Sequence, residues 1–152
     1  MKPRAAIILI ENDRIALIER YKAGRHYFVF PGGKIEAGEA PATAATRETL
    51  EELGLIVEVG RLVAEVWYQG TPQYYFLASR VSGEFGSGKG KEMGNSADSE
   101  KGSHHPIWVA VEDLPAIPLL PAIMAGYTLR NHHDNWPEQP LLIDDTPTDE
   151  SD

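Results

Sequence analysis

The sequence predicts an α/β domain in which a mixed β-sheet lies between helices. At 152 residues the chain fits a single domain, and an apolar content of 42% is enough for a hydrophobic core. Several short segments rich in β-branched and aromatic residues indicate strands. Two segments with helical periodicity interrupt them, one after the third strand and one near the end. This order of elements favours a sheet covered by helices on both faces.

The first part of the chain predicts a hairpin and a third strand. The turn-prone pair Asn12-Asp13 separates the arms of the hairpin, and Pro31 stops the third strand. The run 34–39 is too short, and too interrupted by glycine, to predict a full element. The expected strands cover residues 4–10, 14–20 and 26–30.

A helix between Pro41 and Gly54 has the clearest signal in the sequence. Pro41 suits the first helical turn, where its missing N–H is not needed, and Gly54 suits the left-handed residue that ends a helix. Between them, apolar and threonine side chains recur at helical spacing and define a buried stripe. The members of this stripe are Ala42, Ala45, Thr46, Thr49, Leu50 and Leu53.

The remainder predicts further strands, a long loop and a second helix. Strands are expected at 55–59, 61–68, 73–81 and 106–111, a helix at 119–130 and a short apolar run at 141–143. Gly60 predicts a turn between the first two of these strands. Residues 82–105 are rich in glycine and serine without periodicity, which predicts a flexible loop. We therefore expect one domain over 1–143 and an acidic, disordered tail over 144–152.

Charge and composition narrow the function. A formal net charge of -9, from 14 Lys+Arg against 23 Asp+Glu, gives no general attraction to nucleic acid. A phosphorylated substrate would need metal ions or a local basic patch to offset this charge. The absence of cysteine excludes a disulfide scaffold and a cysteine nucleophile. Neither a signal peptide nor an apolar run of about 20 residues is present, so we expect a cytoplasmic protein without membrane association.

Three glutamates share one face of the predicted helix. Glu48, Glu51 and Glu52 lie opposite the apolar stripe, at spacings where like charges repel. One interpretation is a solvated outer face. The other is that a hard cation such as Mg²⁺ neutralises the cluster, because Mg²⁺ binds through a few carboxylates together with waters and substrate phosphates. The spacing alone does not choose between them.

The register of this helix with the preceding glycine turn favours the metal. Residues 32–55 read GGKIEAGEAPATAATRETLEELGL. This stretch resembles the Nudix box of the Nudix hydrolases, in which a glycine, five residues, Glu and seven residues precede Arg-Glu-aliphatic-any-Glu-Glu-any-Gly-aliphatic. Residues Gly33 to Leu55 follow the pattern, except that Thr49, which is β-branched and close to valine in shape, occupies the first aliphatic position. The resemblance implies the α/β/α sandwich of that family.

The resemblance also implies roles for individual residues. Glu48 and Glu52 are expected to bind the metal, with Glu51 as a third ligand and the backbone carbonyl of Gly33 as a further donor. The expected ion is Mg²⁺, with Mn²⁺ as an alternative. Arg47 is expected either to orient a carboxylate for catalysis or to form a plain surface pair with Glu51. Glu48 or Glu51 would take the proton of the attacking water.

Supporting residues follow from the same resemblance. Glu39 is expected to brace the glycine turn or to support Arg47. A metal-ligating acid from outside the box is common in the family, and Glu92 and Glu100 are the candidates in the long loop.

Two further patterns are not interpreted as sites. Residues 83–90 imitate a phosphate-binding loop but lack Ser or Thr after Lys89. The run His132, His133 and Asp134 is interpreted as surface, because adjacent histidines near a helix end are expected to point apart.

Cations and aromatic rings near the glycine turn are expected to recognise the substrate. Arg20, Arg25 and Tyr27 are the predicted substrate-binding residues, the arginines through phosphate and the tyrosine by stacking on a base. For most residues of the wider set, packing within the sheet is the favoured interpretation. The wider set comprises Arg20, Lys22, Arg25, His26, Tyr27, Phe28, Trp67, Tyr74, Tyr75 and Phe76.

The sequence thus predicts a Mg²⁺-dependent Nudix hydrolase that cleaves the diphosphate bond of a nucleoside di- or triphosphate or of a nucleoside diphosphate derivative. A non-catalytic module that senses a nucleotide is the alternative, although the complete set of charged residues speaks against it. Removal of RNA caps is a third option, which the acidic charge disfavours. The expected partner is a nucleotide-type small molecule. A homodimer is compatible with the sequence, which leaves the oligomeric state open.

Overall fold

The computed structural model describes residues 2–88, 102–133 and 135–144 and confirms an α/β fold with a mixed sheet. Within these residues the strands are β1 (Arg4–Glu11), β2 (Arg14–Lys22), β3 (Arg25–Val29), β4 (Gly32–Lys34), β5 (Leu55–Tyr68), β6 (Thr71–Gly83), β7 (Ser103–Ala110), β8 (Leu119–Leu120) and β9 (Leu141–Asp144). The α-helices are α1 (Pro41–Leu53) and α2 (Ile123–His132), and a 3-10 helix, η1, covers Val111–Ala116.

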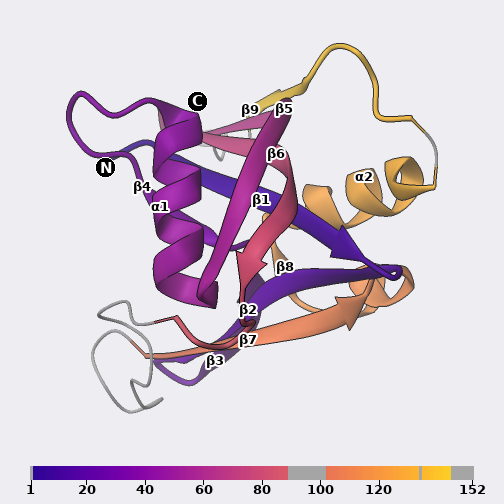
Figure 1. The fold of residues 1–152 in the computed structure, drawn as a ribbon. Coiled ribbons are helices and arrows are strands. Elements are labelled where there is room, and N and C mark those ends of the chain that lie inside the picture. The colour runs from indigo at the N-terminus through magenta and orange to yellow at the C-terminus, as the bar shows by residue number, and fades with distance from the viewer. Residues whose placement is uncertain (1, 89–101, 134, 145–152) are drawn as a thin grey trace.

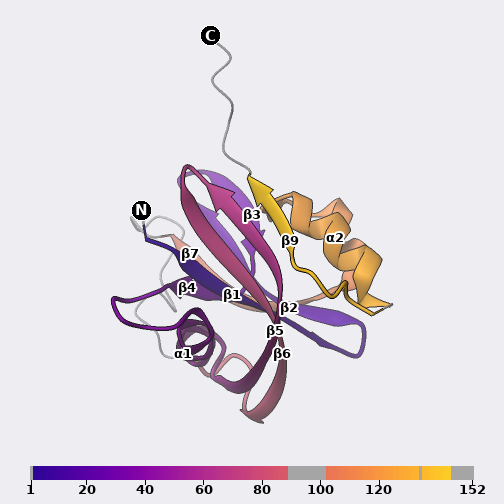
Figure 2. The ribbon, with the colours of Figure 1, turned by 90° about the horizontal axis from the view of Figure 1, so that it is seen from above.

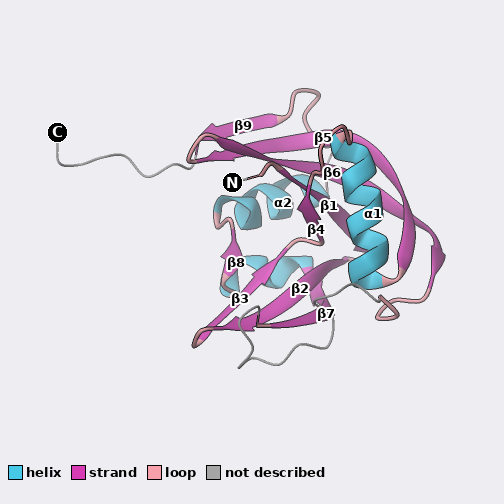
Figure 3. Ribbon diagram, turned by 90° about the vertical axis from the view of Figure 1, so that its left-hand side faces the viewer, coloured by secondary structure: helices cyan, strands magenta, loops and turns pink. Residues whose placement is uncertain are grey.

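Strand β1 is the centre of the sheet. It pairs in parallel with β6 and antiparallel with β2 and β4. The strand order is β8-β3-β2-β1-β6-β5-β9, with β4 added to β1 and β7 added to β2. The pairing of β1 with β2 is confined to Ile10–Ile15 and Glu11–Arg14, beside the hairpin turn. The two groups of strands therefore diverge from this turn, as Figure 3 shows.

Alternate residues of β1 enter two separate cores, because successive side chains of a strand point to opposite faces. Ile7 and Leu9 pack in a core with residues of α1, whereas Ile8 packs in a core with residues of α2. The helical members of these cores are Ala44, Ala45 and Leu53 of α1, and Met124, Ala125 and Tyr127 of α2. The helices thus cover different faces (Figures 1 and 2), which confirms the predicted α/β/α sandwich.

Helix α1 begins and ends close to where the sequence predicts, but its predicted buried stripe was wrong at Leu50, which is 47% exposed, whereas Ala44 is fully buried. Pro41 is its first residue, and Gly54 ends it with a φ of 77° and an N–H bonded to the carbonyl of Leu50. Thr49 is fully buried, and its hydroxyl donates to the carbonyl of Ala45 at 2.7 Å. Because this bond satisfies the hydroxyl, threonine fits an aliphatic position of the box without leaving a buried polar group unpaired.

One strand prediction was wrong, and one short strand was not predicted. Residues 55–68 form one strand, β5, and not two strands separated by a turn at Gly60. Pairing with β6 continues along its whole length, and register shifts between Val59 and Leu62 absorb the irregularity as a bulge. Residues 32–34 form the short strand β4, because β1 offers them a partner that the sequence does not reveal.

The second helix starts later than predicted. Leu119 and Leu120 pair with β3 as strand β8, so α2 begins only at Ile123. Pro121 follows β8 and also favours extended backbone in the residue before it. The apolar periodicity from residue 119 onward therefore spans a strand and a helix, and local spacing cannot separate them.

The predicted loop is shorter than expected at both ends. Residues 82–83 belong to β6 and residues 103–105 to β7, which pairs with β2 from Ser103 to Ala110. Most of the remaining loop and residues 145–152 of the tail lie outside the described residues. Within the part that is described, no helix is long and apolar enough to cross a membrane.

Candidate active site

The glycine turn before α1 lies directly against two of the predicted carboxylates. Strand β4 holds Gly32 and Gly33 on the first residues of β1. The N–H of Gly32 donates to Oε1 of Glu52 at 2.7 Å, and only 7% of Glu52 is exposed. A Cβ at Gly33 would overlap the carboxylate of Glu48. Glycine at this position therefore allows the backbone to approach the carboxylate.

Arg47 joins the turn to the helix. Its guanidinium donates from Nε and Nη2 to the two carboxylate oxygens of Glu39, each at 2.9 Å. It also donates to Oε1 of Glu48 at 2.9 Å and to the carbonyl of Lys34 at 3.0 Å. A bidentate pair of this kind fixes geometry as well as charge. Arg47 thus contacts far more than the plain surface pair with Glu51, from which it lies 3.6 Å away.

These contacts lower the pKa of Glu39. The hydrogen bonds from Arg47, followed by the bond from the backbone N–H of Glu36, lower the pKa of Glu39 to about 2. In return, Glu39 foremost raises the pKa of Arg47 above its ordinary value. Both groups therefore remain charged throughout the neutral range. Glu39 thus contacts Arg47 and the backbone of Glu36, as the expected support of Arg47 requires.

Glu51 differs from its two neighbours. Its side chain is 45% exposed, whereas that of Glu48 is 15% exposed. Across the residues that the structure describes, the three glutamates do not form a group whose ligand atoms all lie within 4.8 Å of one another. Glu48 and Glu51 both pair with Nη1 of Arg47, whereas Glu52 accepts from the N–H of Gly32.

The donors at the glycine turn are all oxygens. Glu48 and Glu52 are four residues apart on α1, and both lie against the backbone of Gly32 and Gly33. Carboxylate and backbone oxygens suit hard cations such as Mg²⁺ and Mn²⁺, and they suit softer transition metals less well. The residues present therefore fit a hard divalent cation, with Glu51 as a more mobile third carboxylate.

A cavity of about 560 Å³ opens on the same turn. Its wall includes Gly32 and Gly33 together with all three predicted substrate-binding residues. Its other polar or aromatic lining residues are Arg4, Phe30, Tyr68, Gln73, Tyr74 and Tyr75. Gly32 and Gly33 therefore contact both the cavity and the carboxylates of α1, although none of the three glutamates is among the residues that line the cavity.

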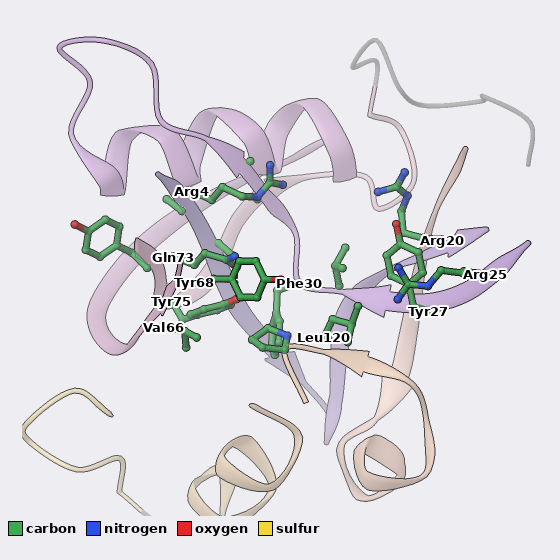
Figure 4. A pocket seen from close by; sticks show the side chains of 17 residues that line it. Arg4, Arg20, Arg25, Tyr27, Phe30, Val66, Tyr68, Gln73, Tyr75 and Leu120 are labelled. Carbon is green, nitrogen blue, oxygen red and sulfur yellow. Dashed lines mark hydrogen bonds between the residues drawn. The ribbon is translucent and has the colours of Figure 1, made fainter. Parts of the chain in front are cut away.

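The predicted substrate-binding residues gather at one end of the cavity (Figure 4). Arg20 and Tyr27 are direct cross-strand partners on β2 and β3. The guanidinium carbons of Arg20 and Arg25 lie 5.6 and 5.1 Å from the centre of the Tyr27 ring. Arg20 also donates to the carbonyl of Ser103 at 3.0 Å. The ring is thus flanked by positive charge, as cation–π contact requires.

The residues at the opposite end of the cavity were not predicted from the sequence. Arg4, Tyr68 and Gln73 line the cavity, and Gln73 accepts a hydrogen bond from the Tyr75 hydroxyl at 3.0 Å. Arg4 lies opposite Gln73 in the parallel pairing of β1 with β6. Only this register brings residue 4 to the site, and no local pattern in the sequence encodes it.

Several other candidates lie elsewhere. His26 bonds to Glu19 at 2.8 Å, and Trp67 donates to Glu65 at 2.6 Å. Phe28 is buried in the core on the side of α2. Glu92 and Glu100 lie outside the described residues.

The adjacent histidines were interpreted incorrectly. The rings of His132 and His133 do not point apart, because their centres are 4.2 Å from each other. His132 is also largely buried, with 10% of its side chain exposed, and it lies beside Asp13 of the hairpin turn. Asp134 lies outside the described residues.

Comparison with known proteins agrees with the motif. The family model described as the NUDIX domain matches residues 1–129. An 8-oxo-dGTP diphosphatase from Escherichia coli is 38% identical over 82 residues, covering 52% of this chain and 51% of that protein. The chain therefore spans about half the length of this curated relative.

Solved structures show the same fold. A Nudix hydrolase from Nitrosomonas europaea matches with a TM-score of 0.70 at 20% identity, over 97% of this chain and 81% of that one. An ADP-ribose pyrophosphatase from Streptococcus suis matches with a TM-score of 0.65 at 20% identity, over 95% and 98%. Because the family model covers most of the sequence, the chain belongs to the Nudix hydrolase family.

Proposed function

We propose that the protein is a Mg²⁺-dependent pyrophosphohydrolase, also active with Mn²⁺, that cleaves the diphosphate bond of a nucleoside di- or triphosphate or of a nucleoside diphosphate derivative. The observation that carries this proposal is the meeting of three features at one turn. The carboxylates of Glu48 and Glu52 lie against the backbone of Gly32 and Gly33, and a cavity with three arginines opens on the same glycines.

Different residues would hold the metal ion, position its ligands and accept the proton of water. Glu48, Glu52 and the Gly33 carbonyl would hold the metal ion, with Glu51 as a further ligand. When bound, the ion neutralises phosphate charge and makes a bound water more acidic. Arg47 keeps Glu48 in place through its hydrogen bond to Oε1. Glu48 and Glu51 are the two candidates for the group that takes the proton of water.

The cavity provides the local basic patch that an acidic chain needs. Arg4, Arg20 and Arg25 bring positive charge to its wall, and its volume of about 560 Å³ lies within the range of small-molecule sites. Tyr68 and Tyr74, which also line the cavity, offer rings for stacking a base. A nucleotide therefore suits the cavity in charge and size, and the net charge of -9 disfavours a long nucleic acid.

The names of the relatives support two substrate classes. One relative is named for a nucleoside triphosphate with an oxidised base, and another for a nucleoside diphosphate sugar. Cleavage inside the phosphate chain is common to both names. We place the enzyme in the cytoplasm as a single domain over residues 1–143, and a homodimer is compatible with this proposal.

A non-catalytic sensor is the alternative function. Such a module would have no need for two carboxylates pressed against a glycine backbone, nor for an arginine that fixes one of them. The arrangement around Arg47 therefore favours catalysis.

A substrate panel tests the proposal. Purified protein would be incubated with Mg²⁺ and nucleoside triphosphates, oxidised nucleotides, dinucleoside polyphosphates and nucleotide sugars, and the phosphate products would be separated. We expect metal-dependent turnover of at least one class, reduced at least about 10²-fold in Glu52→Gln. Glu58→Gln is the matched control, since Glu58 is exposed on β5.

Each outcome has a distinct meaning. Nucleotide binding without turnover of any class would favour the sensor. Equal turnover in wild type and Glu52→Gln would show that the metal site lies elsewhere.

A further inference from the structure

The hairpin turn between β1 and β2 meets the end of α2 at a point remote from the glycine turn. Strand β1 pairs with β4 at Arg4 and reaches the hairpin turn after Glu11, a span of about 25 Å at 3.3 Å per residue. Figure 1 shows α1 and α2 at opposite ends of β1. Whatever binds at this turn is therefore separate from the proposed catalytic carboxylates.

The backbone presents Asp13 in a fixed position. Asn12 and Asp13 both have positive φ, at 53° and 62°, which a two-residue hairpin turn requires and which these residue types tolerate. The carbonyl of Asp13 accepts the N–H of Val111 at 3.0 Å and so ties the turn to η1. The side chain, which is 78% exposed, remains available to a ligand.

Three potential ligand atoms converge here. One carboxylate oxygen of Asp13 and one ring nitrogen from each of His132 and His133 all lie within 4.8 Å of one another. Ligands of tetrahedral zinc are about 3.3 Å apart, given metal–ligand distances near 2 Å. Asp13 and His133 are exposed, so their side chains can rotate to bring the three ligand atoms to this shorter spacing.

His132 supplies an independent sign of a missing partner. Its Nε2 is inaccessible to water and has no hydrogen bond of acceptable geometry, although it lies 3.0 Å from Oδ1 of Asp13. A buried polar atom without a partner costs about 1–3 kcal/mol. A metal ion between the two groups would give this nitrogen the partner it lacks.

The surrounding charges favour a cation. His132 is the last residue of α2, where the helix dipole places partial negative charge, and the carboxylate of Asp13 adds to it. Two imidazoles and one carboxylate suit zinc or a related transition ion, with water completing the coordination. The all-oxygen site at the glycine turn has the opposite preference.

We propose that Asp13, His132 and His133 form a second metal site that takes Zn²⁺ or a similar transition ion and ties the β1–β2 turn to the end of α2. The site draws on residues far apart in the sequence. It does not depend on the proposed hydrolase activity.

The test is zinc binding by calorimetry in the presence of excess Mg²⁺, which occupies the hard-cation site. Wild type is expected to bind one Zn²⁺ in this class of site. Asp13→Asn and His133→Ala are expected to weaken it at least about 10-fold, because each removes a ligand. Both positions are exposed, so both variants should fold. His105→Ala is the matched control, since it removes an exposed histidine paired with Glu19 on another part of the sheet.

Two further readouts locate the ion. On addition of Zn²⁺, the ring nitrogens of His132 and His133 are expected to shift in nitrogen NMR spectra, while those of His105 do not. Saturating Zn²⁺ should raise the melting temperature of wild type by about 5 °C, and that of His133→Ala by much less. His133→Ala should retain Mg²⁺-dependent hydrolysis.

Other results would overturn the site. Equal zinc affinity in wild type, Asp13→Asn and His133→Ala would show that the cluster is not a ligand set. Loss of zinc binding in Glu52→Gln alone would assign the ion to the carboxylates of α1. A change in stability in Asp13→Asn without any zinc binding in wild type would leave only an ion pair between Asp13 and His132.

Discussion

The two ends of β1 lie beside different helices and carry different donors. At the glycine-turn end, α1 presents carboxylates to the backbone of Gly32 and Gly33, and Arg47 hydrogen-bonds to one of them, Glu48. At the hairpin-turn end, α2 presents two histidines to a single aspartate. Oxygen donors suit hard cations and imidazoles suit transition metals, so the two metal sites that we propose at the ends of this strand have opposite metal preferences.

The two ends of β1 also differ in which parts of the sequence contribute their residues. The glycine turn and its carboxylates come from one continuous stretch, residues 32–55, in which helix periodicity fixes the spacing of the carboxylates on α1, and the pairing of β4 with β1 holds the glycines in place. The hairpin-turn site joins residue 13 to residues 132–133, and only the packing of α2 beside η1 and β8 brings them together. Local sequence therefore specifies the first site and long-range packing specifies the second.

The largest expected effect comes from adding a side chain at Gly33 of the glycine turn. In Gly33→Ala the new Cβ would overlap the carboxylate of Glu48, so this side chain must move while the fold persists. We expect kcat/KM to fall about 10²-fold, because a displacement of about 1 Å at a catalytic group has this effect.

Gly60→Ala is the control for this substitution, since its Cβ would meet only the carbonyl of Leu77 at 3.4 Å. Zinc binding at the hairpin turn should be unchanged in both variants. Steady-state kinetics on the substrate found in the panel measures the effect, and unaltered activity in Gly33→Ala would contradict the placement of Glu48.

The next effect concerns Arg47, which hydrogen-bonds to a carboxylate of the proposed metal site. Lysine cannot donate to Glu39 through two parallel bonds while also holding Glu48. Arg47→Lys should therefore lower kcat by about 10-fold or more, in the range found when partners of metal ligands are replaced.

Arg80→Lys is the matched control, because Arg80 makes an exposed ion pair with Glu11 near the hairpin-turn end. A similar loss of activity in both variants would mean that Arg47 acts only through general charge.

Features fixed within one segment can be predicted from the sequence, whereas features that depend on pairing between distant segments cannot. The limits of α1 and the burial of Thr49 follow from caps and periodicity within one segment. The bulge in β5 and the late start of α2 depend on pairing with β6 and β3, which local spacing does not encode. For the same reason, the sequence does not predict that Arg4 lines the cavity or that the two histidines lie beside Asp13.

A smaller effect is expected at the far side of the cavity. Arg25 lies against the Tyr27 ring on its wall, away from the carboxylates. Arg25→Ala should raise KM about 5- to 10-fold with little change in kcat, because it removes binding shared by the ground and transition states. Lys22→Ala, at an exposed cation outside the cavity, should leave both constants unchanged. A fall in kcat alone would place Arg25 in the chemical step instead.

The smallest effect is on stability at low pH. The pKa of Glu39 is held at about 2, below its ordinary value of 4.5, so the native state favours the ionised carboxylate. The stabilisation is fully present above pH 4.5 and is lost as the pH falls toward 2. Glu39→Gln should therefore be less stable than wild type at pH 7, and the difference should narrow through this window.

Urea unfolding at several pH values measures this difference. Glu58→Gln should differ little from wild type at any pH, because Glu58 is exposed on β5. A constant difference for Glu39→Gln across the window would show that Arg47 does not act through the charge of Glu39.

The most direct test of the proposed active site is a titration with Mn²⁺ followed by electron paramagnetic resonance. Free Mn²⁺ would be counted in wild type, Glu48→Gln, Glu52→Gln and His133→Ala, alongside hydrolysis by the same samples. We predict that both glutamate variants lose Mn²⁺ binding and activity together, while His133→Ala keeps both. Unchanged Mn²⁺ binding in Glu48→Gln and Glu52→Gln would contradict the assignment of the metal to the carboxylates at the glycine turn.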